Sequence, residues 1–116
     1  MQGYIYSIIC ESTGKRYIGI TEDLKRRFNH HKSDLNLNKH HSPKLQNAWN
    51  YYGSEDFTFT FREIEINCYD DLYELEKQEI AKFDSYNNGY NCNPGGKISD
   101  WKQKVDNVDI VDFLCV

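Results

Sequence analysis

Two short segments near the N-terminus consist of aromatic, apolar and glycine residues, at positions 3–6 and 17–19. Residues 11–15 between them are polar and contain the glycine that a tight hairpin turn requires. This pattern predicts an antiparallel hairpin that brings Tyr6 and Tyr17 close together on one face of a sheet. Tyrosines often simply pack in the core of a hairpin, but two neighbouring phenols also suit a polar partner lying against them.

A third strand is predicted at residues 57–61, where phenylalanine and threonine alternate strictly, as in a half-buried strand. Ile64 and Ile66 continue the alternation in the opposite phase, so a bulge or break is expected at residues 62–63. Added to the hairpin, this strand completes a sheet of three antiparallel strands.

Apolar residues at helical spacing predict a first helix after Thr21, which is expected to be its N-cap with two acidic residues in the first turn. Arg27 and His31 lie beside the apolar row of this helix and not on its solvent face. A histidine in such a place is more often a buried structural residue than a catalyst. An arginine there needs an anionic or carbonyl partner. The apolar row consists of Leu24, Phe28 and Leu35.

Ser42 and Pro43 predict the start of a second helix, as its N-cap and its first helical residue, and Gly53 predicts its end. His40 and His41 precede this helix. The N-terminus of a helix also attracts phosphate, so Ser42 is either a plain cap or a phosphate contact.

A third helix is predicted from about residue 70, with Leu72, Leu75, Ile80 and Phe83 as its apolar row. Glu76 stands four residues from both Leu72 and Ile80, which places its carboxylate in the inward row. Such a carboxylate usually has a cation, a hydrogen-bond donor or a metal beside it, and a salt bridge to Arg27 is the structural alternative. Residues 88–96 form a turn cluster in which Asn91 is either a turn residue or a functional one.

These elements predict a small α+β domain over residues 1–97, a three-stranded antiparallel sheet flanked by about three helices. A chain of 116 residues with 39% hydrophobic residues suits one compact domain. Residues 98–116 are interpreted as a tail that forms a final helix or strand packed on the core, a dimer contact or the stub of a linker. The four cysteines are scattered, form no CxxC pair and are expected to be reduced thiols.

The net charge of −4 argues against strong DNA binding, but the charge is unevenly distributed along the chain. Residues 15–44 contain eight Lys or Arg against three Asp or Glu, whereas residues 55–84 contain three against ten. The first segment therefore predicts a basic face that can meet phosphate. No apolar run is long enough to span a membrane and no secretory signal is visible, so a cytoplasmic, non-secreted protein is expected.

Taken in order, the motifs between residues 3 and 96 resemble those of the GIY-YIG nuclease superfamily, most closely the catalytic domains of phage-type, intron-encoded homing endonucleases. The first motif departs slightly from the family pattern, because Tyr4 stands between the glycine and the Ile-Tyr pair. A tryptophan common after the glutamate in this family is also absent. The residues that carry the resemblance are Gly3-Tyr4-Ile5-Tyr6, Tyr17-Ile18-Gly19, Arg27, His31, His40, Ser42, Glu76 and Gly89-Tyr90-Asn91.

The resemblance implies hydrolysis of a DNA phosphodiester with the help of a divalent metal. It implies that Glu76 binds Mg²⁺, with Mn²⁺ as the alternative ion, and that Arg27 stabilises charge on the phosphate. Tyr6 would accept the proton of the attacking water, which requires positive charge from the metal, Arg27 or His31 because a free phenol has a pKa near ~10. Tyr17 and His31 would orient this network or the phosphate.

Three further residues are candidates for substrate binding by the same resemblance, and one of them is also expected to orient Glu76 or the backbone near it. The three are His40, Ser42 and Asn91, and the one also expected to orient Glu76 is Asn91. The partner would be DNA, and the protein would be a monomer or a weak dimer. Two other functions stay open: a non-catalytic nucleic-acid or protein interaction module on the same scaffold, and a repair nuclease for branched or damaged DNA.

Overall fold

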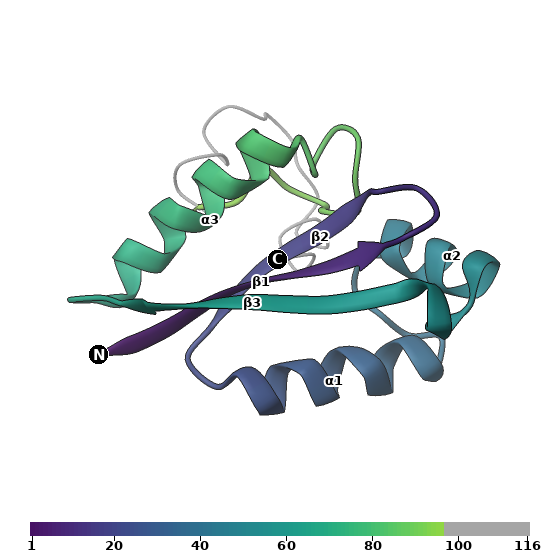
Figure 1. Ribbon diagram of the computed structural model, residues 1–116, viewed down its shortest axis with the longest axis horizontal. Coiled ribbons are helices and arrows are strands. Elements are labelled where there is room, and N and C mark those ends of the chain that lie inside the picture. Colours follow the sequence, from purple (N-terminus) through teal and green to yellow (C-terminus); the bar gives the residue numbers. More distant parts are fainter. Residues whose placement is uncertain (97–116) are drawn as a thin grey trace, which may run out of the picture.

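Three antiparallel strands form a single sheet in the computed structural model of the protein, which describes residues 1–96. The strands are β1 (Gln2–Cys10), β2 (Arg16–Thr21) and β3 (Phe57–Glu65), and their spatial order is β2-β1-β3 (Figure 1). The turn between β1 and β2 contains Gly14 at a φ of 72°, a conformation that glycine adopts without strain. The predicted sheet is confirmed, and the predicted tail at residues 98–116 lies outside the described residues.

Strand β3 contains no bulge, so that prediction was wrong. Its pairing with β1 runs without interruption from Gln2 opposite Glu65 to Cys10 opposite Phe57. The apolar residues change from one face of β3 to the other because both faces of the sheet are covered. Phe59 packs into the cluster on one face, and Ile64 packs into the cluster on the other.

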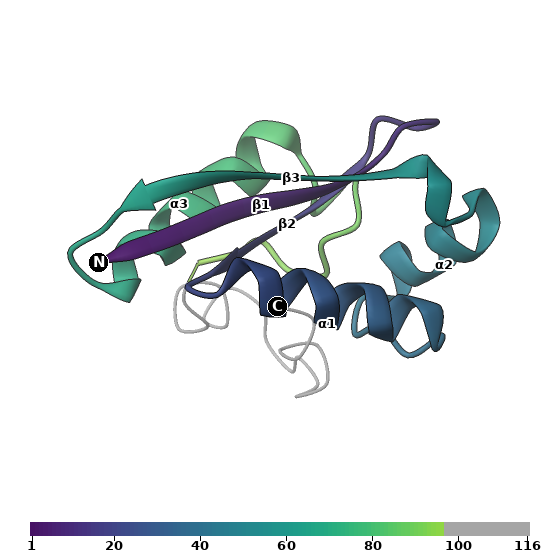
Figure 2. The same cartoon turned by 60° about the horizontal axis from the view of Figure 1, so that its bottom comes forward.

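The helices lie on opposite sides of the sheet, as the two views in Figures 1 and 2 show. Helices α1 (Leu24–Asn36) and α2 (Pro43–Tyr52) cover one face, and α3 (Tyr69–Phe83) covers the other. A short 3₁₀ turn, η1 (Ser54–Asp56), leads from α2 into β3. Within residues 1–96, no helix combines the length and the apolar character needed to cross a membrane.

The helix starts follow the sequence with one exception. Ser42 caps α2 as predicted, with its Oγ accepting a hydrogen bond from Leu45 N at 3.3 Å. The N-cap of α1 is Asp23 and not Thr21, because the Asp23 carboxylate accepts from Arg26 N at 3.2 Å. Thr21 ends β2 instead, and its Oγ1 accepts from Asp23 N at 3.0 Å. Two polar residues thus share the turn between strand and helix.

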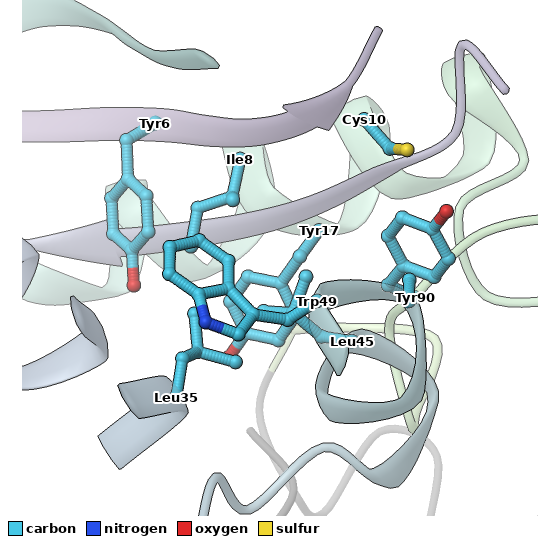
Figure 3. Close-up of a cluster of buried hydrophobic side chains, with 9 residues drawn as sticks. Tyr6, Ile8, Cys10, Tyr17, Leu35, Leu45, Trp49 and Tyr90 are labelled. Atoms are coloured by element: carbon cyan, nitrogen blue, oxygen red, sulfur yellow. The ribbon is translucent and has the colours of Figure 1, made fainter. Parts of the chain in front are cut away.

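The main core lies between the sheet and the α1 and α2 helices (Figure 3). Tyr6 and Tyr17 both belong to it, and each side chain is about 1% exposed. In Figure 3 their rings extend from the sheet on the same side, which confirms the predicted proximity of the two phenols. The other buried members are Ile8, Cys10, Leu35, Leu45, Ala48, Trp49 and Tyr90. A smaller cluster of Ile5, Ile18 and Ile80 lies on the α3 side.

Gly19 leaves the space that the Tyr6 ring occupies. The two residues are directly opposite each other across β1 and β2, and a Cβ on Gly19 would collide with the phenol of Tyr6. The ring cannot easily move, because its hydroxyl is held by Arg27 and His31. Glycine at this position is therefore needed for packing, although it lies inside a strand.

We predict that Gly19→Ala lowers the free energy of unfolding by about 2 kcal/mol, because it overpacks a site whose neighbours are fixed. Urea denaturation followed by circular dichroism measures this loss. Thr60→Ala, at an exposed position of β3, is the control and should change stability little. An unchanged denaturation midpoint for Gly19→Ala would contradict the packing described above.

Candidate active site

A pocket of about 270 Å³ opens beside β2, at the edge of the sheet. Its lining includes four of the five predicted catalytic residues: Tyr6, Tyr17, Arg27 and Glu76. They come from β1, β2, α1 and α3, and the two helices lie on opposite faces of the sheet. Because β2 is an edge strand, residues from both faces can meet beside it. The predicted convergence of two phenols, a guanidinium and a carboxylate is therefore present.

The Tyr6 hydroxyl is held by two residues of α1. Its oxygen lies 2.6 Å from His31 Nε2 and accepts a hydrogen bond from Arg27 Nε at 3.2 Å. Burial raises the pKa of Tyr6 to about 12, despite the opposing effect of the nearby Arg27 charge. In the free protein at neutral pH, Tyr6 is therefore a phenol that keeps its proton.

A cluster of three histidines lies behind the two tyrosines. His31 Nδ1 is 2.7 Å from His40 Nε2, and His41 Nε2 is 2.9 Å from the Tyr17 hydroxyl. Burial is the main cause that lowers the pKa values of His31, His40 and His41 to about 2, 3 and 4, and the Arg27 charge lowers them further. The rings are therefore neutral, so His31 can supply an N–H group to Tyr6 but not the positive charge considered from sequence.

Glu76 is buried as its spacing predicted, with 3% of the residue exposed. Its Oε1 accepts a hydrogen bond from Gly96 N at 3.1 Å, and within residues 1–96 its carboxylate has no other hydrogen bond. Gly95 has a φ of 80°, which turns the loop toward α3. Burial raises the pKa of Glu76 to about 7, partly offset by the Gly96 hydrogen bond and by the Arg27 charge.

The salt bridge considered for Arg27 and Glu76 does not form. The ion pairs within residues 1–96 do not include this one, and the Arg27 Nε donates to Tyr6 instead. Arg27 is only partly buried and borders the same pocket as Glu76. Its guanidinium thus remains close to the carboxylate without neutralising it directly, which leaves both charges available to a ligand.

A divalent ion fits this carboxylate only if other oxygens complete its coordination. The described part of the chain contains no group of three His, Cys, Asp or Glu residues that could hold a metal. One buried carboxylate facing a polar pocket is the pattern that suits Mg²⁺, which retains several waters and binds phosphate oxygens. The donor set therefore fits a hard ion such as Mg²⁺ or Mn²⁺ and not a structural zinc ion.

The three residues expected to bind substrate do not line the pocket. Ser42 is fully enclosed, and its Oγ donates to Tyr90 O at 2.6 Å. His40 is buried behind His31. These two residues support the site from behind, and neither presents an atom to the pocket in this structure.

Asn91 holds the C-terminal loop against β2. Its Nδ2 donates to Ile18 O at 2.9 Å, and its Oδ1 accepts from Ile18 N at 2.9 Å and from Ser85 Oγ at 2.7 Å. Both backbone groups of Ile18 face outward from the sheet edge, so the amide replaces a missing neighbouring strand. Asn91 makes no hydrogen bond to Glu76, contrary to one expectation, and it positions β2 between Tyr17 and Gly19 instead.

Sequence reasoning missed several residues at the pocket. Tyr69 and Tyr73 line it, and their rings pack edge to face at 5.1 Å between centroids. They precede Glu76 by seven and three residues, so helical spacing could have placed all three on one face of α3. Arg26 has the helical spacing of an ordinary solvated charge but borders the same pocket, and the contact of His41 with Tyr17 was not predicted.

Comparison with known proteins identifies related domains. The family model of the GIY-YIG catalytic domain matches residues 2–91. Intron-associated endonuclease 1 of Enterobacteria phage T4 is 33% identical over 91 residues, which cover 78% of this chain. Those residues cover 37% of the phage protein, so the chain spans little more than a third of that relative.

Two solved structures share the fold. A glutamate-to-alanine mutant of the catalytic domain of intron endonuclease I-TevI has a TM-score of 0.73 and 32% identity, covering 81% of this chain and 96% of that one. A second structure of the catalytic domain of homing endonuclease I-TevI has a TM-score of 0.69 and 31% identity, with 74% and 92% coverage. The similarity extends over nearly all of both solved domains.

The neutral histidine cluster predicts that the protein loses stability in mild acid. Unfolded histidines take up protons below about pH 6.5, whereas the folded protein keeps the buried rings of His31 and His40 and the half-buried ring of His41 neutral to lower pH. Each ring then lowers the free energy of unfolding by about 1.4 kcal/mol per pH unit as the pH falls. Glu76 offsets the effect of one of these three histidines between about pH 7 and pH 4.5. Because its pKa is raised to about 7 in the folded protein, Glu76 holds a proton there that it releases on unfolding.

Urea denaturation at several pH values between 7 and 4.5 measures this slope. We expect a net uptake of about two protons on unfolding near pH 5, and of about one proton in His41→Asn. Stability that stays constant from pH 7 to pH 5 would show that these rings are not held neutral.

Proposed function

Because the chain belongs to the GIY-YIG family, we propose that it is a divalent-metal-dependent endonuclease that hydrolyses DNA phosphodiester bonds. The observation that carries this proposal is the meeting of Tyr6, Arg27 and Glu76 at one pocket, although they lie on three separate elements. Each has a chemical role that phosphodiester hydrolysis requires: a proton acceptor, a cation for the phosphate and a ligand for a metal.

Glu76 would hold the metal ion. Its Oε2 has no hydrogen bond within residues 1–96, and the carboxylate borders the pocket that the phosphate would enter. Mg²⁺ is the proposed ion, with Mn²⁺ as the alternative, and when bound it would supply positive charge beside the phosphate oxygens. Because the pKa of Glu76 is raised to about 7, binding of a cation there has to displace a proton in mild acid.

Arg27 would bind the phosphate. One side of its guanidinium is used by the Tyr6 hydroxyl, and the forked group still borders the pocket together with Arg26. A fork of N–H groups matches two phosphate oxygens and stabilises the charge that they carry as the bond to water forms. The two arginines would thus bring positive charge to the pocket of a chain whose overall charge is negative.

Tyr6 would take the proton of the attacking water on its hydroxyl oxygen. It can do so only as a phenolate, and its raised pKa means that the phenolate is rare in the free protein. Positive charge in the pocket lowers the pKa of a nearby phenol, so the phenolate is favoured when Arg27 and a bound cation act together. As the water oxygen bonds to phosphorus, its proton moves to Tyr6 and the leaving oxygen departs with the electron pair of the broken P–O bond.

Tyr17 would orient the phosphate or its waters. It borders the pocket, and its hydroxyl lies against His41. Its pKa is raised well above its usual value by burial, so the group is a neutral hydrogen-bonding partner and not a base. We assign the role of base to Tyr6, whose hydroxyl contacts both His31 and Arg27 Nε, whereas the Tyr17 hydroxyl contacts His41.

One such pocket cuts one strand at a time, so a double-strand break would need a dimer or a second binding event. We propose a monomer or weak dimer that binds DNA weakly by itself. The α1 segment and its flanks carry the basic residues, while the segment that includes α3 is acidic. Binding that depends on such phosphate contacts weakens steeply with salt.

We predict that the protein nicks supercoiled plasmid in Mg²⁺ or Mn²⁺ and that EDTA abolishes the nicking. Glu76→Gln should reduce the rate by about 100-fold or more, because an amide cannot replace a carboxylate as the metal ligand. The same substitution should raise the free energy of unfolding at pH 8, since it removes a buried charge whose pKa is raised. Agarose gels and urea denaturation measure the two effects.

Glu74→Gln is the matched control, because Glu74 is an exposed carboxylate on the same helix. It should leave both the rate and the stability nearly unchanged. Nicking by Glu76→Gln at the wild-type rate would refute the metal-ligand assignment. A wild-type protein that binds DNA but does not cut it in either metal would favour a non-catalytic interaction module.

A further inference from the structure

An unbroken chain of hydrogen bonds leads from the start of α2 to the Tyr6 hydroxyl. Ser42 N donates to His40 Nδ1 at 3.0 Å, and His40 Nε2 lies 2.7 Å from His31 Nδ1. His31 Nε2 then lies 2.6 Å from Tyr6 Oη. All four residues are less than 9% exposed, so bulk water does not compete for these contacts.

The direction of every bond in this chain follows from its first donor. A backbone N–H can only donate, so His40 Nδ1 is an acceptor and carries no proton. A neutral imidazole has one N–H group, which for His40 must therefore be Nε2–H, and it points at His31 Nδ1. His31 Nδ1 is then an acceptor as well, and its own proton lies on Nε2, facing Tyr6.

We propose that His40 is a positioning residue. Because it accepts from the Ser42 amide, it donates to His31, which in turn donates to Tyr6, so that the Tyr6 proton faces the pocket. The phenol oxygen then accepts from two groups, His31 Nε2 and Arg27 Nε, and both of its lone pairs are used. Its hydrogen has to point in the remaining direction, toward the pocket that Tyr6 lines.

The opposite direction would have a different chemical result. If His31 carried its proton on Nδ1, Tyr6 would donate its hydroxyl hydrogen to His31 Nε2 and aim it away from the pocket. His31 would then be the group that removes the proton from Tyr6. With the proposed direction, Tyr6 exchanges its proton with the pocket, and the phenolate keeps two N–H donors while its free lone pair faces an incoming water.

The backbone around His40 is fixed independently of the histidine rings. Gln46 Oε1 accepts from His40 N at 3.0 Å, and Gln46 Nε2 donates to Leu35 O at 3.0 Å. Ser42 Oγ is bound to Tyr90 O and caps α2. The Ser42 amide therefore points at His40 because hydrogen bonds hold the start of α2 on both sides. The residue that caps α2 thus also helps to set the hydrogen bonding at Tyr6.

The tautomers can be measured directly in the wild-type protein by long-range ¹H–¹⁵N correlation spectra of the histidine side chains at pH 7.5. We expect Nε2–H for both His31 and His40, with Nδ1 unprotonated in each ring. A proton on Nδ1 of His31, or a doubly protonated ring at either position, would overturn the proposal. This measurement needs neither DNA nor metal, so its result does not depend on the proposed nuclease function.

The effect on Tyr6 rests on the proposed function, and a pair of variants at His40 tests it. His40→Leu removes both the acceptor for Ser42 N and the donor to His31, whereas the amide of His40→Gln keeps an N–H donor for His31 and an oxygen that can accept from Ser42 N. We expect His40→Leu to show a mixture of His31 tautomers and about 10- to 100-fold slower nicking, as for groups that orient a functional residue through one hydrogen bond. His40→Gln should recover the Nε2–H tautomer and most of the rate.

Equal rates for the two variants, with the His31 tautomer unchanged in both, would refute the positioning role. If His40→Leu does not fold, wild-type spectra and the rate of His40→Gln still decide the question. The expected tautomers in a wild-type protein that cuts no DNA would instead refute the proposed nuclease function and leave the direction of the hydrogen bonds established.

Discussion

The burial of the Tyr6 phenol against a glycine is the constraint on which the rest of the site depends. Tyr6 and Gly19 face each other across β1 and β2, and the space left by the missing side chain admits the aromatic ring. The ring then lies on the edge strand with its hydroxyl within reach of α1. A buried hydroxyl has to be hydrogen-bonded, and Arg27 and His31 provide its partners.

The edge position of β2 explains how groups from both faces of the sheet come together. In the interior of a sheet, the neighbouring strands would lie between side chains from α1 on one face and α3 on the other. Beside the edge strand β2 no strand intervenes, and the Arg27 and Glu76 side chains border a common pocket. The exposed edge also has to be closed, and the side chain of Asn91 does this by pairing with both backbone groups of Ile18. The loop that carries Asn91 continues to Gly96, which binds Glu76.

Local rules predicted much of this arrangement from sequence. Ser42 and Pro43 specify a helix start, and Glu76 was placed inward because apolar residues stand four positions away on both sides. The bulge in β3 was wrongly predicted, because periodicity cannot distinguish a defect in one strand from a sheet that is covered on both faces. Thr21 and Asp23 are both good caps, and only the backbone decides between them.

Local sequence rules could not predict contacts between residues that are distant in the sequence. Nothing near Asn91 indicates that its amide binds Ile18, 73 residues away, and the family resemblance pointed to Glu76 instead. The family resemblance pointed to His31 as an orienting residue and to His40 as a substrate contact, and neither residue lines the pocket. Their neutral state depends on burial under Tyr6 and Tyr17, which only the folded chain creates.

The central claim is that the proposed cation binds to Glu76 in the pocket that Tyr6 and Tyr17 also line, beside β2. Titrating Mn²⁺ into ¹⁵N-labelled protein tests it most directly, because the ion broadens the amide signals of nearby residues. We predict that the signals of Tyr6, Gly19 and Glu76 broaden first and that Glu76→Gln removes this effect. First broadening at the acidic start of α3, around Asp70 and Asp71, with the pocket signals unchanged, would contradict the account.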